Sequence, residues 1–243
     1  MNNGPLLFLG IFATLASSFW GLLLVPELQL GGRQQVTNSA TLGLYPQPRS
    51  GSAKAGAEVY RSLGCVECHT EQMRGVGADL ARGWGPRKTV PQDYLGDYPV
   101  MLGAQRIGPD LADLGVRQTN ATDLLRHIFS PQLSVPGSMM PPYRFLFERR
   151  ELKPGQATSP EAVALEMGGG GPNYEVVPLP EANYLADYLL SLRANAPLLE
   201  APMPKSITST NEAPDTNATN IASTNTLAAP NTATNAPPAN PVK

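Results

Sequence analysis

The sequence predicts an all-α protein with one N-terminal transmembrane helix, a helical domain and a disordered C-terminal tail. Three observations predict this architecture. Residues 6–25 carry no charge, apolar spacing or capping residues indicate helices in three later segments, and residues 201–243 consist mostly of Ala, Thr, Asn and Pro. The predicted divisions are a transmembrane anchor over 5–26, a linker over 27–52, the folded domain over 53–199 and the tail over 200–243.

The N-terminal segment is long enough to cross a membrane. Residues 6–25 are 20 consecutive uncharged positions, and a helix of this length spans about 30 Å. A cleaved signal peptide normally begins with Lys or Arg and ends at a small-residue cleavage site, whereas the first basic residue here is Arg33. We therefore expect an uncleaved anchor, with Trp20 near one interface and Pro26 ending the helix.

The composition indicates a loop-rich domain without a basic binding surface. Gly and Pro supply 23 and 25 of the 243 residues, so turns and loops are expected to be abundant. The formal net charge is -2, from 18 basic and 20 acidic side chains. This balance gives no indication of nucleic-acid binding.

Three helices are expected in the folded domain, at residues 53–63, 122–129 and 181–192. Thr122 or Asn120 is placed to cap the second helix, and Pro131 follows its end. Pro180 stands at the start of the third. The apolar face of the third helix needs a partner, and the first helix is the natural one.

Two long segments are predicted to be irregular. Residues 75–107 contain many Gly and Pro residues and are expected to form an ordered loop with Trp84, Tyr94 and Tyr98 as anchors. Residues 148–178 are expected to be a surface excursion, because a charged stretch is followed by the glycine run at 168–171.

The segment Cys65-Val66-Glu67-Cys68-His69 carries the chemistry. Two thiols three residues apart, followed at once by a histidine, are typical of a c-type haem: the thiols add to the haem vinyl groups and the imidazole coordinates iron. A redox dithiol needs no such histidine and usually lies in an alternating strand and helix pattern. A structural zinc site needs four ligands, and the chain has only two Cys and two His. We therefore predict a cytochrome c-like domain with one covalent haem c.

A haem with one histidine ligand needs a sixth ligand or an open site. Met140 is the preferred candidate, because it lies in the Pro-rich segment Ser138-Met139-Met140-Pro141 downstream of the second helix. Met139 and His127 are the alternatives. In the simplest competing interpretation, both methionines only pack on the porphyrin and neither coordinates iron.

Further residues are expected around the haem. The carbonyl of Pro109, in the segment 108–111, is the candidate acceptor for the second imidazole nitrogen of His69. Arg74, Arg106 and Arg117 are candidates for binding the haem propionates, since arginine offers a planar fork of donors to a carboxylate. At least one of the three is expected to be a solvated surface residue.

Beyond the haem motif, the chain resembles subunit II of the cbb3-type cytochrome c oxidases, the CcoO or FixO family, over roughly residues 6–192. The matching segments are 60–61, 64–70, 72–74, Arg106-Ile107-Gly108-Pro109-Asp110-Leu111, 115–117, His127, Pro131 and Pro136-Gly137-Ser138-Met139-Met140-Pro141-Pro142-Tyr143. The chain departs from the family pattern at Gly75, where proline is common, in the loop around 168–171 and in the tail.

The resemblance implies an electron-relay subunit with histidine and methionine as iron ligands. Its haem domain would lie on the periplasmic side of the bacterial cytoplasmic membrane. Electrons would arrive from a di-haem cytochrome c subunit or a soluble cytochrome c and pass to the catalytic haem-copper subunit, which reduces oxygen to water. The chain itself would then be a non-catalytic subunit of the oxidase.

Two other functions stay open at this stage. One is the small cytochrome c subunit of a nitric oxide reductase, against which the segments 106–111 and 138–143 argue. The other is a free membrane-tethered electron shuttle without a fixed oxidase. In these two functions and in the oxidase subunit alike, electron transfer needs a haem edge near a partner, so the chemistry alone does not distinguish them.

Overall fold

The computed structural model describes residues 3–38, 41–75, 78–163 and 173–203. The described residues are mostly helical, but two antiparallel sheets of two strands each accompany the helices. The prediction of an all-α chain is therefore corrected: the fold is mostly helical with two small hairpins. The part of the predicted disordered tail beyond residue 203 lies outside the described residues, and so does the glycine run at 168–171.

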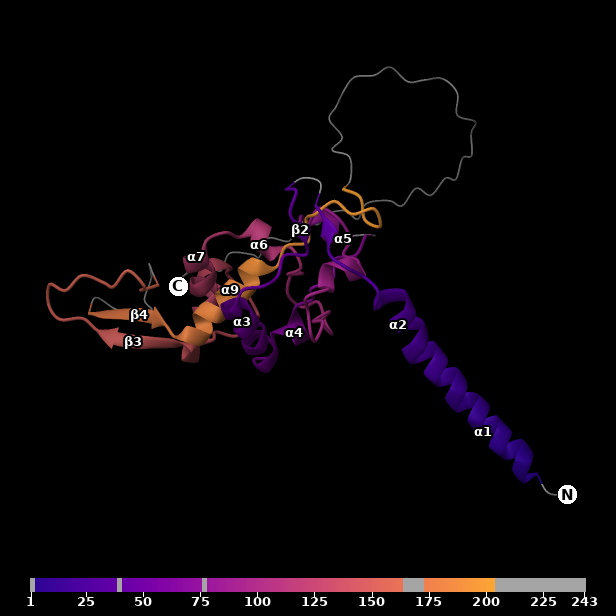
Figure 1. The fold of residues 1–243 in the computed structure, drawn as a ribbon. Coiled ribbons are helices and arrows are strands. Elements are labelled where there is room, and N and C mark those ends of the chain that lie inside the picture. The colour runs from indigo at the N-terminus through magenta and orange to yellow at the C-terminus, as the bar shows by residue number, and fades with distance from the viewer. Residues whose placement is uncertain (1–2, 39–40, 76–77, 164–172, 204–243) are drawn as a thin grey trace, which may run out of the picture. The chain divides into compact units, whose positions relative to one another are not determined.

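The N-terminal apolar helix runs without a break from Gly4 to Leu30 (Figure 1). It consists of α1 (Gly4–Phe19), a π-helical turn (Trp20–Leu24) and α2 (Val25–Leu30). None of its side chains is buried, and its most apolar stretch has a mean hydropathy of 2.0. By length and composition this helix is able to cross a membrane.

The helix does not end at Pro26, so this detail of the prediction was wrong. Proline inside an α-helix lacks a donor and clashes with the carbonyl four residues back. Here the π-helical turn stands directly before it, and the Val25 N–H bonds to the carbonyl of Trp20, five residues earlier. A π-turn is one of the recognised ways in which a helix accommodates such a disturbance.

Part of the predicted linker forms a small hairpin. Strand β1 (Val36–Thr37) pairs with β2 (Leu44–Tyr45) in antiparallel register, with Val36 opposite Tyr45. Tyr45 is 6% exposed, and its hydroxyl donates to a carboxylate oxygen of Asp93 at 2.5 Å. The hairpin is thereby joined to the long loop of the domain.

The core of the domain is built on α3 (Gly51–Ser62), which packs against α9 (Pro180–Ser191), as predicted (Figure 1). The rings of Tyr60 and Tyr188 meet at the centre of this contact, with centroids 5.4 Å apart. Helix α3 begins two residues before the predicted start, because the Ser50 hydroxyl caps it by accepting from the Ala53 N–H.

Helix α7 (Ala121–Phe129) also packs on this core. Of the two candidates for its cap, Asn120 is the residue used: its side-chain oxygen accepts from the Thr122 N–H at 2.9 Å. The buried residues of α7 are Leu124, Leu125, Ile128 and Phe129. All three predicted helices are therefore present, with ends that differ by no more than two residues.

Short elements and a second hairpin complete the domain. The short helices are α4 (Cys65–Cys68), α5 (Ala78–Ala81), α6 (Leu114–Arg117) and α8 (Pro131–Ser134), with 3-10 turns at Pro91–Tyr94 and Arg144–Leu146. Strands β3 (Phe147–Glu151) and β4 (Tyr174–Pro178) form a hairpin inside the segment that the sequence predicted to be an excursion. Phe147 joins it to α7 through an edge contact with Phe129 at 5.2 Å.

Candidate functional site

The cysteine motif forms the single turn α4, which follows α3 almost directly. Cys65 and Cys68 are three residues apart on this turn, so their side chains lie on one face. Both cysteines are free and half-buried. His69 follows in an extended conformation, which directs the chain away from the turn.

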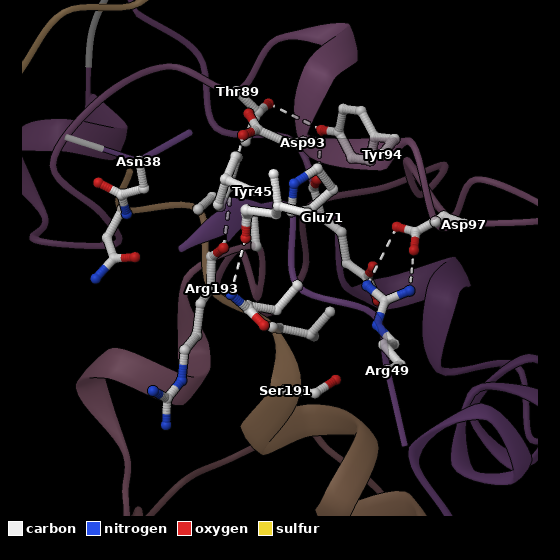
Figure 2. A pocket seen from close by; sticks show the side chains of 18 of the residues that line it. Asn38, Tyr45, Arg49, Glu71, Thr89, Asp93, Tyr94, Asp97, Ser191 and Arg193 are labelled. Atoms are coloured by element: carbon white, nitrogen blue, oxygen red, sulfur yellow. Dashed lines mark hydrogen bonds and ion pairs between the residues drawn. The ribbon is translucent and has the colours of Figure 1, made fainter. Parts of the chain in front are cut away.

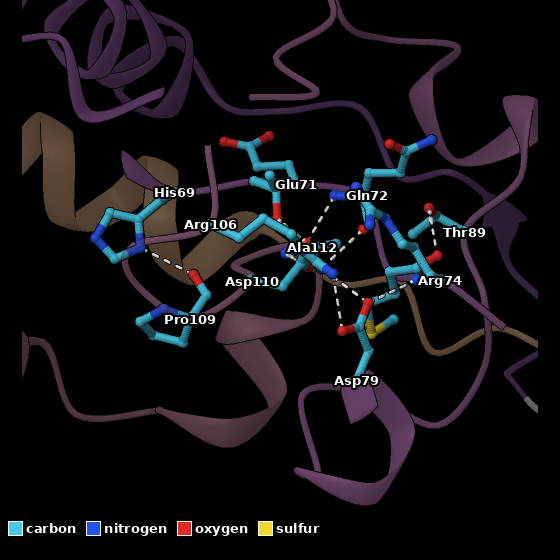
Figure 3. A network of polar contacts seen from close by, with 12 residues as sticks. His69, Glu71, Gln72, Arg74, Asp79, Thr89, Arg106, Pro109, Asp110 and Ala112 are labelled. Carbon is cyan, nitrogen blue, oxygen red and sulfur yellow. Dashed lines mark hydrogen bonds and ion pairs between the residues drawn. The ribbon is translucent and has the colours of Figure 1, made fainter. Parts of the chain in front are cut away.

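His69 is held by the segment that contains Pro109. Its Nδ1 lies 2.9 Å from the Pro109 carbonyl oxygen, where the sequence predicted this contact (Figure 3). Burial lowers the pKa of His69, and the Pro109 carbonyl opposes this effect, so the ring is neutral at physiological pH. No hydrogen bond joins Nε2 to any residue that the structure describes, which leaves this nitrogen available to a metal.

Gly108 lies close to the imidazole of His69. A Cβ atom at this position would come within 2.3 Å of Cε1 of His69, a distance that no side chain permits. Any side chain at position 108 would therefore force the His69 ring or the backbone to shift.

The surroundings of the thiols do not favour the zinc or dithiol interpretations. Burial raises the pKa of Cys65 to about 11, against the lowering effect of a hydrogen bond with Tyr143. A raised pKa makes the Cys65 thiol less reactive in thiol exchange, which needs the thiolate. Among the described residues, no group of three or more His, Cys, Asp or Glu side chains is placed to hold a metal ion.

The segment with the two methionines passes close to the cysteine motif. Tyr143 forms a hydrogen bond with the Cys65 thiol, and its own N–H donates to the Ile128 carbonyl at 3.0 Å. Gln132 donates to the Met140 carbonyl at 3.0 Å and so holds the segment at its other side.

The three candidates for the sixth ligand have different surroundings. Met140 is half-buried, whereas Met139 is 80% exposed. His127 lies within electrostatic range of His69, which together with burial lowers its pKa. The assignment of Met140 stays a prediction, and the exposure of Met139 disfavours that alternative.

The three arginines predicted near the propionates are grouped around Asp110 and Asp79, to which the Arg74 N–H donates at 2.9 Å. Arg106 binds Asp79 through both terminal nitrogens at 2.8 Å and lies 3.3 Å from Asp110 (Figure 3). Arg117 donates to the main-chain carbonyl of Asp110, and the Arg74 side chain is exposed. Their role toward propionates stays a prediction, and the guanidinium of Arg106 already has protein partners.

Sequence reasoning missed the two carboxylates that bind Arg106. Asp110 is fully buried and Asp79 is 3% exposed. The only signal for Asp110 was its place directly after Pro109, and no local pattern indicated that Asp79 is buried.

A cavity of about 310 Å³ lies beside Glu71, two residues after His69 (Figure 2). Glu71 lines it, and its carboxylate accepts from the Tyr188 hydroxyl at 2.8 Å. Burial raises the pKa of Glu71 to about 7, while the hydrogen bond from Tyr188 and the charge of Arg49 lower it. Neither the two cysteines nor His69 lines this cavity, so it is separate from the cysteine motif.

The residues of the motif fit a covalently bound haem c. Two free thiols stand one turn apart, and a neutral imidazole with an available Nε2 follows them. The Tyr60 hydroxyl is buried and has no hydrogen-bond partner among the described residues. A buried hydroxyl needs a hydrogen-bond partner, which for Tyr60 comes from outside that set.

Comparison with known families agrees with this site. A family model described as cytochrome C oxidase, mono-heme subunit/FixO matches residues 6–170. The matched span includes the apolar helix, the cysteine motif, Pro109 and Met140. No curated protein matches the chain at a significant level.

Proposed function

Since this chain belongs to the family of mono-haem cytochrome c oxidase subunits, FixO, we propose that it relays single electrons to the catalytic subunit of a cbb3-type oxidase. Family membership makes the chain a subunit of an oxidase with one haem and a catalytic partner. The apolar helix Gly4–Leu30 suits a membrane anchor. The relay, the covalent attachment and the identity of the ligands are the proposed part.

In this proposal Cys65 and Cys68 would hold the haem through thioether bonds, and His69 and Met140 would be the ligands of its iron. Haem iron changes between the ferric and ferrous states by one electron, which is the chemistry that a relay needs. The observation that carries the proposal is the geometry of His69, whose Nδ1 is bound to Pro109 while Nε2 is available. The Pro109 carbonyl fixes the tautomer and the orientation of the ring.

The protein partners follow from the same proposal. Electrons would arrive one at a time from a di-haem cytochrome c subunit or a soluble cytochrome c and leave to the catalytic haem-copper subunit, where oxygen is reduced to water. The haem domain would lie on the periplasmic side of the bacterial cytoplasmic membrane. The residues of this chain would bind and orient the haem, and the reduction of oxygen would take place in the partner subunit.

Gentle extraction of the tagged protein from its native membrane tests this function. We expect b-type haem, copper and cyanide-sensitive oxygen uptake to accompany the c-type haem in the purified material. The spectrum is recorded as reduced minus oxidised, and oxygen uptake is measured with a reduced cytochrome c as the electron donor.

The same preparation distinguishes the other two functions. Purification with c-type haem alone would show a membrane-tethered shuttle. Consumption of nitric oxide, with b-type haem and without copper, would show a subunit of a nitric oxide reductase. Either result would contradict the proposed function.

A further inference from the structure

We propose that Arg106 and Asp110 are positioning residues: they hold the segment with Pro109 against the segment with His69, and so keep the Pro109 carbonyl on the imidazole. The inference rests on the proposed function, because it concerns the residue assigned as the proximal haem ligand. We call the two side chains the Arg106–Asp110 clamp.

The two segments already meet through their main chains on either side of His69. The Gly108 N–H donates to the Cys68 carbonyl at 2.9 Å, and the Leu111 N–H donates to the Thr70 carbonyl at 2.8 Å. Pro109 lies between these two hydrogen bonds and supplies no N–H of its own. The position of its carbonyl therefore depends on how firmly the flanking residues are held.

Asp110 holds the segment on one side. Its carboxylate is fully buried and accepts from the Thr70 hydroxyl at 2.6 Å and from the Gln72 N–H at 2.9 Å. The second oxygen accepts from the Ala112 N–H at 2.9 Å. A buried carboxylate is costly unless its oxygens are hydrogen-bonded, so these donors fix the side chain in one position. Because Thr70 and Gln72 flank residue 71, the carboxylate joins the stretch after His69 to the residue after Pro109.

Arg106 holds the same segments on the solvent side, where its side chain is 21% exposed. Its Nε donates to the Thr70 hydroxyl at 3.1 Å, and Nη2 reaches the Gln72 carbonyl at 3.2 Å and Asp110 at 3.3 Å. The two terminal nitrogens bind Asp79 bidentately (Figure 3). The guanidinium also lies over the ring of Trp84, 5.4 Å from its centroid.

These contacts depend on the shape of arginine as well as on its charge. A planar guanidinium donates in several fixed directions at once, whereas an ammonium group is a compact point charge. Lysine at position 106 would keep the positive charge and lose most of this set of hydrogen bonds. The substitution therefore separates the geometry of the clamp from its charge.

The clamp has a predicted effect on the haem. An imidazole that donates firmly through Nδ1 to a carbonyl is a more basic ligand, and a more basic ligand stabilises ferric iron. Loosening the Pro109 carbonyl weakens this hydrogen bond and destabilises the ferric state. The reduction potential should then shift to a more positive value.

The test compares Arg106→Lys with Arg61→Lys in the full-length protein purified with its partner subunits. Arg61 is a matched control, because its ion pair with Glu58 on α3 has both side chains more than half exposed. We expect Arg106→Lys to retain covalent haem and its axial ligands, to shift the potential upward, and to exchange the His69 Nδ1 proton faster than the wild type. The control should match the wild type in all of these measurements.

Thr70→Val provides a second variant, because it removes the hydroxyl that joins both clamp residues while keeping the side-chain shape. It should shift the potential and the proton exchange in the same direction. Unchanged potential and exchange in both variants, with haem retained, would overturn the inference. Loss of the folded haem domain in both would also overturn it, because the contacts would then serve stability alone. Wild-type protein without covalent haem would instead contradict the proposed function.

Discussion

Met139 and Met140 are neighbours in the sequence with different surroundings, and this difference is informative at the scale of single residues. Met139 is 80% exposed, whereas Met140 is half-buried in a segment that Gln132 and Tyr143 hold beside Cys65. A thioether ligand raises the reduction potential of a haem relative to a second imidazole. The proposed role of Met140 is therefore open to a direct test.

Replacing Met140 by histidine should lower the reduction potential and leave the haem covalently bound. The measurement is a spectroelectrochemical titration of the purified complex. Met139→His is the matched control and should leave the potential unchanged. An unchanged potential in Met140→His, or a lowered one in the control, would refute the assignment of the sixth ligand.

Asp79 gives a prediction about pH. Burial alone would raise its pKa, but hydrogen bonds from Arg106 and from the Arg74 N–H, with the charge of Arg106, lower it below the ordinary 3.8. A carboxyl whose pKa is depressed in the folded state stabilises the fold above its unfolded pKa, and this contribution is lost as the pH falls through the folded value. The protein should therefore lose stability below about pH 4.

The variant Asp79→Asn should lack this dependence. At neutral pH we expect it to be less stable by about 1–3 kcal/mol, because Arg106 loses the carboxylate that it binds bidentately. Thermal unfolding of both proteins at about pH 6 and about pH 3 measures the effect, and the difference between them should shrink at the lower pH. If the difference in stability between the two proteins were the same at both pH values, protonation of Asp79 would not contribute to acid unfolding.

At the scale of elements, local sequence signals were sufficient for the helices and insufficient for the hairpins. Asn120 and Pro180 mark helix starts, and both signals act within one turn. The pairing of Phe147 with Pro178 joins positions 31 residues apart, and no local pattern specifies such a partner. The π-turn before Pro26 was missed for a different reason: proline normally indicates the end of a helix, and here the helix continues past it.

The candidate site follows the same division. The cysteine motif and His69 could be predicted from their short spacing in the sequence. The Pro109 carbonyl could be predicted because the second imidazole nitrogen of His69 needs an acceptor. The partners of Arg106 were not, because Asp79 lies 27 residues earlier in the chain and its burial results from tertiary packing. An arginine is equally compatible with a haem propionate and with a protein carboxylate until the fold is known.

The contact between α3 and α9 gives a prediction about packing. A Cβ atom on Gly56 would come within 1.8 Å of the Tyr184 carbonyl oxygen, which belongs to the backbone of α9. Gly56→Ala should therefore destabilise the domain by about 1–3 kcal/mol or more, although alanine is the better helix former. Gly51→Ala is the control, because a Cβ there meets no atom within 4 Å.

Thermal unfolding of the haem-loaded protein checks this prediction. Gly51→Ala should unfold at the wild-type temperature or slightly above it. If Gly56→Ala were as stable as Gly51→Ala, the close approach of the two helices would not be required for the fold.

At the scale of the whole molecule, the apolar helix contributes no buried side chain to the part of the chain that the structure describes. Its 27 residues correspond to about 40 Å, which exceeds the hydrocarbon core of a bilayer. The helix is therefore expected to serve attachment, while the cysteine motif packs against the core on α3, α7 and α9.

Deleting residues 1–30 should release a folded domain from the membrane. The shortened chain, exported with a separate cleavable signal, should appear in the soluble fraction with covalent haem, whereas the full chain should stay with the membranes after a high-salt wash. A shortened chain that aggregates or remains in the membrane fraction would show that the domain itself needs the helix or binds the bilayer.

The central claim is that Cys65 and Cys68 bind one haem covalently, with His69 as the proximal ligand. It is tested most directly by the intact mass and the pyridine haemochrome spectrum of the denatured, purified chain. We predict a mass increased by one haem, a spectrum of the c type, and loss of both in the double variant Cys65→Ala, Cys68→Ala. An unmodified mass for the wild-type chain, with haem that acidic solvent extracts, would contradict the claim.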